Sequence, residues 1–241
     1  LHLCDRRQRQ MCIRDSNTTW CAIQDSYGFL WIGTSNGLNC YYGSGNKIYR
    51  NVLNDKYSLG NNFVSSLMEE GEDLWIGTSS GLYIYDRSDD HFLYFDKTTK
   101  YGVFISCEVK KIVKTKNGLI WIATLGQGIF IYDPAKDVLT QNSIRTFFAW
   151  DICQGTDSLV YVSSMQEGLL CFDEEGTFLQ NYPVSSELNI GNQRINCLHS
   201  IDHEIWCGVG TNSLGCYQEG SQELKIYNTS AESFSSILCL M

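Results

Sequence analysis

Proline and long apolar runs are scarce in this sequence. Only 2 of its 241 residues are proline, against 21 glycines, which favours tight turns between short strands over extended linkers. No segment approaches the roughly 18 consecutive apolar residues that indicate a membrane-spanning helix. Apolar residues nevertheless make up 43% of the chain, so a packed core can form.

Positive charge is also in deficit. The chain has 18 lysines and arginines against 27 aspartates and glutamates, for a formal net charge of -9. Because nucleic-acid-binding surfaces are normally basic, this balance predicts no nucleic-acid partner. It leaves polar ligands, sugars included, open.

Residues 1–16 lack the alternation of strands. They hold four of the 18 basic residues and no apolar core of the kind that a secretory signal needs. The segment resembles translated adapter sequence, so we expect it to be foreign or disordered. The native start of the protein, including any export signal, would then lie outside this sequence.

A repeat organises the rest of the chain. Its anchor is an aromatic residue in segments such as LWIGT at 30–34 and 74–78. The five anchors are Trp31, Trp75, Trp121, Tyr161 and Trp206. Their spacings of 44, 46, 40 and 45 residues, with strand-like units between turns, are typical of β-propeller blades.

Each unit predicts four short antiparallel strands. The anchor lies in the second strand, a glycine ends the next turn, and the third strand ends in an aromatic residue. The sequence therefore predicts an all-β fold of five blades, at about 17–63, 64–108, 109–148, 149–194 and 195–233. FSSIL at 234–238 aligns with VSSLM at 64–68, so 234–241 is expected to begin a sixth blade and the chain to be part of a propeller.

The 11 cysteines do not form a disulfide or zinc pattern. Their number is odd and no CxxC pair occurs. Cys40, Cys171 and Cys216 each precede the third-strand aromatic residue, and Cys207 stands where other repeats have isoleucine. We expect these four to be small apolar core residues, and we expect no metal and no cofactor.

The first repeat carries a family resemblance. The pattern D-x-x-G-x-L-W-I-G-T-x-x-G-L-x-x-Y from Asp25 to Tyr41 resembles the two-component regulator propeller repeat. With KIYRNVLNDKYSLGNNFV at 47–64, the region is similar to the opening blade of the periplasmic sensor region of Bacteroides-type hybrid histidine kinases. Tyr161 in place of tryptophan, and Ser213 in place of the turn glycine, make the likeness weaker in the fourth and fifth repeats.

The resemblance implies more than these residues contain. It implies a fragment of a seven-bladed propeller, followed by remaining blades, a second propeller and a kinase that is absent here. It also implies a periplasmic ectodomain of an inner-membrane protein that senses oligosaccharides, signals across the membrane as a homodimer and has no catalytic site of its own.

Catalytic patterns in the sequence have simpler interpretations. G-x-S-x-G occurs at 33–37 and 77–81, but between two strands instead of between a strand and a helix, so both copies are expected to be turns. His199 and His203 flank a strand-to-strand turn and are expected to be solvated. Glu69 and Glu70 are adjacent on a strand, point to opposite faces and are expected to be solvated charges.

One column of the repeat is predicted to be functional. After the apolar residue that starts each first strand, the repeats have Trp20, Ser65, Lys110, Trp150 and Asn196. Since most of these residues are polar, packing does not require an aromatic residue there. First strands line the channel of a propeller, so Trp20 and Trp150 are predicted to stack on sugar rings, with Lys110, Arg194 and Asn196 as hydrogen-bond donors. In the alternative, both tryptophans plug the channel or pack under a loop.

Two further functions stay open. A lyase similar to the streptogramin-inactivating propellers would need a histidine and carboxylates clustered near the channel, and His199 is the candidate closest to a first strand. A propeller that binds only proteins would need neither. Fold alone does not separate these functions.

Overall fold

The computed structural model describes residues 18–43, 45–144, 146, 148–184, 194–210 and 213–228. These residues form two compact units. Unit 1 runs to Asp96 and includes Ile105–Val109, and unit 2 comprises Lys97–Phe104 and the chain from Lys110. The expected segment 1–16 and the expected strand at 234–241 lie outside the described residues.

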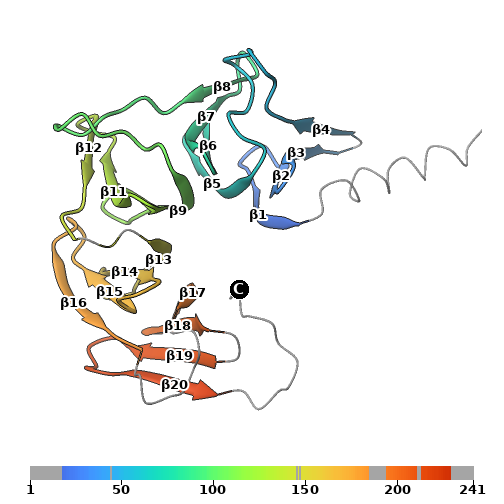
Figure 1. Cartoon of the computed structure of the whole chain (residues 1–241). Helices are drawn as coiled ribbons and strands as arrows, with labels where there is room; N and C mark the ends of the chain where they lie inside the picture. The colour runs from blue at the N-terminus through green and yellow to red at the C-terminus, as the bar shows by residue number, and fades with distance from the viewer. Residues whose placement is uncertain are drawn as a thin grey trace, which may run out of the picture. The chain divides into compact units, whose positions relative to one another are not determined.

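Five antiparallel sheets of four consecutive strands make up the fold (Figure 1). Blade 1 contains β1 (Thr19–Gln24), β2 (Leu30–Thr34), β3 (Gly37–Tyr42) and β4 (Gly45–Tyr49). Blade 2 contains β5 (Val64–Glu70), β6 (Asp73–Thr78), β7 (Gly81–Asp86) and β8 (His91–Tyr94). Blade 3 contains β9 (Glu108–Lys114), β10 (Ile120–Leu125), β11 (Gly128–Asp133) and β12 (Val138–Gln141).

The remaining two sheets lie in unit 2. Blade 4 contains β13 (Ala149–Gln154), β14 (Val160–Ser164), β15 (Leu169–Phe172) and β16 (Phe178–Tyr182). Blade 5 contains β17 (Ile195–Ile201), β18 (Glu204–Val209), β19 (Ser213–Gln218) and β20 (Leu224–Asn228). The prediction of five four-stranded antiparallel blades is therefore confirmed.

Turn chemistry follows the sequence pattern. The glycines that precede the third strand of blades 1 to 4 all have positive φ, between 77° and 119°. Asp86, Asp133 and Asp173 each accept a backbone N–H from two to four residues ahead, which closes the turn into the fourth strand. These local signals separate the strands of a blade.

The core consists of the repeated aromatic and apolar residues. Trp31, Trp75, Trp121 and Tyr161 are buried, whereas Trp206 is half-buried. The four cysteines expected to be apolar core residues, Cys40, Cys171, Cys207 and Cys216, are all buried.

A common contact joins successive blades within each unit. In unit 1 the ring of Trp31 lies 5.2 Å from the ring of Tyr85 in the next blade. In unit 2 the corresponding pairs are Trp121 with Phe172, at 5.6 Å, and Tyr161 with Tyr217, at 5.5 Å. The second-strand aromatic residue of one blade thus packs on the third-strand aromatic residue of the following blade.

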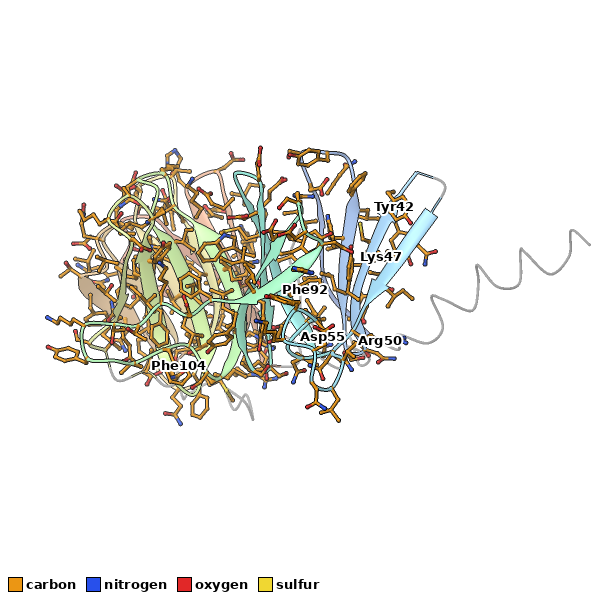
Figure 2. The ribbon with its side chains drawn as sticks, turned by 90° about the horizontal axis from the view of Figure 1, so that it is seen from above. Tyr42, Lys47, Arg50, Asp55, Phe92 and Phe104 are labelled. Atoms are coloured by element: carbon orange, nitrogen blue, oxygen red, sulfur yellow. The ribbon has the colours of Figure 1, made fainter. Side chains whose placement is uncertain are left out.

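A polar contact supports the outer strands. In unit 1 the hydroxyls of Tyr49 and Tyr85 donate to Asp90, at 2.7 Å each. Asp90 also pairs with Lys47. Lys47 lies on β4 (Figure 2). In unit 2 Asp137 likewise accepts the Tyr132 hydroxyl at 2.6 Å and pairs with Lys97 at 2.6 Å. Both aspartates have positive φ at the turn before the fourth strand, which places the carboxylate under the tyrosine.

No helix long and apolar enough to cross a membrane is found in the part of the chain that the structure describes.

Candidate functional site

The predicted functional column coincides with a β-bulge. The register between the first and second strands shifts at Trp20 in blade 1, Ser65 in blade 2, Trp150 in blade 4 and Asn196 in blade 5. A bulge residue is left out of the ladder and its side chain is redirected. The column therefore differs from its neighbours in backbone geometry as well as in composition.

The polar residues at the bulge are buried and hydrogen-bond to backbone carbonyls. Ser65 is 9% exposed, and its hydroxyl lies within hydrogen-bond distance of the carbonyl of Val109 and, at 3.2 Å, of the carbonyl of Gly77. Asn196 is 2% exposed and its amide donates to the carbonyl of Gly210 at 2.8 Å. A short polar side chain at the bulge thus satisfies the carbonyl near the end of the second strand. Trp20 and Trp150 place a large aromatic ring at this position in place of a short polar side chain.

Trp150 lies at the centre of a cationic cluster in unit 2. The Lys110 ammonium lies 4.3 Å from the centroid of the Trp150 ring, and the Arg194 guanidinium lies 4.8 Å from it. All three side chains are half-buried. Lys110 comes from β9, Trp150 from β13, and Arg194 from the residue before β17, so three successive blades contribute (Figure 1).

Asn196 contacts Arg194 at the edge of this cluster. The Nε–H of Arg194 donates to the side-chain oxygen of Asn196 at 2.6 Å, while the Asn196 amide is bound to Gly210. The backbone N–H of Gly210 in turn donates to the carbonyl of Arg194 at 2.8 Å. These bonds fix the position of the Arg194 guanidinium beside the Trp150 ring.

Asp151 is a neighbouring residue that the sequence analysis missed. Its carboxylate lies 3.5 Å from the ammonium of Lys111 in blade 3 and accepts the backbone N–H of Leu198 in blade 5 at 2.9 Å. The Asp151 side chain in blade 4 therefore contacts both neighbouring blades. The sequence contained a signal for this contact, because Lys111 and Asp151 occupy the same position in adjacent repeats and have opposite charges.

Trp20 belongs to unit 1 and has its own surroundings. Its side chain is 41% exposed, and its ring lies 5.1 Å from that of Phe63 in the segment before β5. Contact with a loop is what the alternative interpretation predicted, although much of the ring stays accessible. Lys110, Trp150, Arg194 and Asn196 come together in unit 2, whereas Trp20 belongs to unit 1.

Two acidic residues, Asp25 of blade 1 and Glu69 of blade 2, bind the same arginine, Arg87. Asp25 accepts the Trp31 indole N–H at 2.7 Å and an Arg87 N–H at 2.8 Å. Arg87 also pairs with Glu69 at 3.2 Å, and Glu69 accepts the backbone N–H of Ser26 at 2.8 Å. The expectation that Glu69 is a solvated charge was therefore wrong, because a neighbouring blade supplies its partners.

One histidine of blade 5 has two polar partners. His203 is exposed in the turn before β18, and its Nδ1 lies 2.6 Å from the Thr156 hydroxyl and 3.1 Å from the Glu219 carboxylate. Burial would raise the pKa of Glu219, but hydrogen bonds from Thr156 and His203 outweigh it and hold that pKa below its ordinary value. Because the same nitrogen faces both partners, this histidine cannot relay a proton from the hydroxyl to the carboxylate.

The remaining chemical patterns are structural. Both G-x-S-x-G segments are turns between second and third strands, as expected. Within the described ranges, no group of three or more histidine, cysteine, aspartate or glutamate side chains could hold a metal ion.

Comparison with known proteins identifies the repeat. Residues 14–36 match the family model described as two component regulator propeller, which confirms the resemblance seen at Asp25–Tyr41. The chain therefore carries a two-component regulator propeller repeat. No curated protein matches it.

Solved structures with the same fold include two sensor ectodomains. The extracellular domain of the hybrid two component system BT3049 from B. thetaiotaomicron superimposes with a TM-score of 0.73 and 19% identity, over 87% of this chain and 30% of that chain. The extracellular domain of the one component system BT4673 from the same organism gives 0.68 and 21%, over 91% of this chain and 28% of that chain. Virginiamycin B lyase from Staphylococcus aureus gives 0.67 and 15%, over 89% of this chain and 71% of that chain.

At these identities the likeness shows a shared propeller fold. The chain spans less than a third of the length of either sensor ectodomain.

Proposed function

We propose that this chain is the ligand-sensing propeller region of a two-component sensor histidine kinase, exposed on the outer side of the inner membrane. The propeller repeat at residues 14–36 and the fold shared with two extracellular sensor domains support this proposal. The region binds an oligosaccharide or a similar polar ligand, has no catalytic site of its own, and passes the signal on by changing the balance between two arrangements of a homodimer.

One observation supports ligand binding here. Trp150 occupies a bulge where polar side chains serve the sheet elsewhere, and it lies half-buried between cations from the two adjacent blades. An amphipathic ring beside fixed hydrogen-bond donors is the usual arrangement of a polar-ligand site. Since Lys110 and Arg194 lie over the ring, a sugar would rest against the part of it that they leave open.

A binding experiment tests this proposal. The full-length protein is screened on a glycan array, and its hits are measured by calorimetry with wild type and Trp150→Ala. We expect Trp150→Ala to weaken binding at least about tenfold, a factor that corresponds to 1.4 kcal/mol. Tyr101→Ala is the matched control, because Tyr101 is an exposed ring with Lys100 at 5.0 Å and lies outside the bulge column.

Equal binding by wild type and Trp150→Ala would contradict the site. A full-length protein that binds no glycan but captures a protein partner would instead favour the protein-binding alternative.

The fold shared with virginiamycin B lyase makes a lyase the second candidate. His199 on β17 is half-buried and is the histidine on a first strand. Incubation of the full-length protein with virginiamycin B and a divalent cation, followed by mass spectrometry, separates the two functions. We expect the antibiotic to remain intact, and turnover that is lost in His199→Ala would establish the lyase.

A further inference from the structure

One face of blade 1 is apolar and exposed. Leu30 on β2 is 41% exposed, whereas the residues at the same position of blades 2, 4 and 5 are fully buried. Those residues are Leu74, Val160 and Ile205. Each is paired with the third-strand aromatic residue of its own sheet, as Leu30 is paired with Tyr41. Blade 1 therefore has the sequence of a covered face, but Leu30 remains exposed in the described structure.

The exposure extends over the sheet face that carries Leu30, which we call the front face. Ile32 follows Leu30 by two residues, so both side chains point to one side of the strand. Ile32 and Tyr41 are half-buried, whereas Ile76 and Tyr85, at the same positions of blade 2, are buried. Contiguous apolar surface of this kind marks an interaction site, unlike single exposed residues.

The contacts inside each unit show what a front face binds. In unit 1, Trp31 of blade 1 lies in the same buried cluster as Leu74 and Tyr85 of blade 2. In unit 2, Tyr161 of blade 4 lies in the same buried cluster as Ile205 of blade 5. The front face of a blade therefore packs on the second-strand aromatic residue of the blade before it.

Blade 5 presents a second-strand aromatic residue on a partly open face. Trp206 is half-buried and stacks on Tyr227 of the same sheet, with 6.2 Å between the ring centroids. Its indole N–H donates to the Glu204 carboxylate at 2.9 Å, as that of Trp31 donates to Asp25 at 2.7 Å. The Trp206 ring is thus fixed in the same way as a tryptophan that packs on another blade.

A hollow lies on the same side of blade 5. Its lining includes Cys216, Lys225 and Tyr227. Cys216 is paired with both Trp206 and Lys225 across the sheet, so the hollow and the indole share one face. At the contacts between successive blades of a unit, a third-strand aromatic ring lies 5.2 to 5.6 Å from the second-strand ring. The hollow is suited to such a ring.

A glutamine on blade 1 is arranged for contact with a preceding blade. In blade 4, the Gln154 amide donates to the Ser158 carbonyl at 3.0 Å, and its oxygen accepts the backbone N–H of Lys116 in blade 3 at 2.8 Å. Gln24 has the same position in blade 1, and its amide donates to the Gly28 carbonyl at 3.5 Å. Blade 1 thus has the polar as well as the apolar groups of a front face.

We propose that the front face of blade 1 binds the Trp206 face of blade 5 in a second copy of this chain. Trp206 of one copy packs on Leu30 and Ile32 of the other, and Tyr41 enters the hollow on blade 5. Because the two faces differ, the contact is head-to-tail and builds rings or open rows of copies instead of a two-fold dimer. Neither face contains Trp150, so this association is independent of the proposed ligand site.

The mass of the 241-residue chain in solution tests the association. Size-exclusion chromatography with light scattering should give a mass above that of one chain, which falls on dilution. Leu30→Glu should raise the concentration at which copies associate at least about tenfold, because the contact would bury an unpaired charge. Leu53→Glu is the matched control, because Leu53 is 85% exposed and lies between β4 and β5, outside the sheets.

A mixing experiment identifies the two faces. The Leu30→Glu variant keeps blade 5 intact, and the Trp206→Glu variant keeps blade 1 intact. Each variant alone should therefore be monomeric, whereas an equimolar mixture should form a complex of one copy of each. A variant that fails to fold could not restore association, so the mixture also controls for misfolding.

Three results would overturn the proposal. A wild-type chain that stays monomeric at every concentration would leave both faces to further blades of the same polypeptide. Association that is unchanged in Leu30→Glu and Trp206→Glu would place the contact elsewhere. Association that persists in Trp206→Glu but not in Leu30→Glu would mean that blade 1 binds another copy of itself.

Discussion

Asp25 is a carboxylate enclosed by donors from two neighbouring blades. Its side chain is fully buried and binds the indole of Trp31, the guanidinium of Arg87 and the backbone N–H of Phe29. Burial would raise the pKa of Asp25, but these hydrogen bonds outweigh it and hold the pKa below its ordinary value. A lowered pKa means that Asp25 stabilises the fold above the unfolded value of about 3.9, and that this contribution is lost as the pH falls through the folded pKa.

The indole partner of Asp25 allows a matched test. Trp121 occupies the same repeat position as Trp31 and is equally buried, but its indole N–H has no hydrogen-bond partner among the described residues. Trp31→Phe removes a bond to a charged group and should cost about 1–3 kcal/mol more than Trp121→Phe at pH 7. Urea unfolding measures both variants.

The difference between the two variants should shrink as the pH falls below about 3.9, because protonated Asp25 no longer makes a charge-assisted bond. Equal losses for the two variants at pH 7 would show that the Asp25 contact adds nothing beyond packing.

At the scale of the strand, the turn before the third strand depends on glycine for two reasons. Gly168 has φ of 85°, and a side chain there would overlap the carbonyl oxygen of Tyr182 at the end of the fourth strand. Gly118, in the turn between the first and second strands of blade 3, has a similar φ of 89° but open space around it. Comparing substitutions at Gly118 and Gly168 therefore distinguishes the cost of backbone strain from the cost of steric overlap.

Alanine substitution should therefore affect the two glycines unequally. Gly118→Ala should lower the free energy of unfolding by about 1–2 kcal/mol, the cost of placing an alanine in the left-handed backbone conformation. Gly168→Ala must also move β16 away from the turn, and we expect a loss larger by at least about 1 kcal/mol. Chemical denaturation with both variants measures the difference, and identical losses would mean that the outer strand adjusts freely.

At the scale of the whole molecule, equivalent residues differ because their neighbouring sheets differ. Trp121 is fully buried and packs on Phe172 of the next blade. Trp206 is half-buried and stacks on Tyr227 of its own blade, whose side chain is 50% exposed. The position in the repeat is the same, but the contribution to stability is not.

Truncation of these two tryptophans makes the difference measurable. Trp121→Ala should cost about 3–5 kcal/mol, the usual range for a buried aromatic residue. Trp206→Ala should cost less, because part of the residue is already exposed to solvent. Both residues lie in unit 2, so urea midpoints followed by far-UV circular dichroism compare them directly. Equal losses would contradict the observed difference in burial.

The sequence alone determined the blades. The recurrence of Trp31 and its equivalents, the turn glycines and the aspartates at the fourth-strand turn are local signals, and each acts within about ten residues of chain. The same comparison of repeats singled out the column of Trp20 and Trp150, because two tryptophans stood where the other repeats have polar residues. The alignment of the repeats also predicted correctly that Cys40 and Cys207 are buried apolar residues.

Only the tertiary structure decided the partners of these residues. Asn196 binds Arg194 and Gly210, Lys110 and Arg194 converge on Trp150, and Glu69 meets Arg87 instead of solvent. Most of these contacts join residues from different strands or blades, often about 40 residues apart in sequence. The direction of a bulge side chain also depends on the local twist of two paired strands, which a column of residue types does not contain. The repeat thus fixes where a functional residue stands, and the packing of adjacent blades fixes what it can bind.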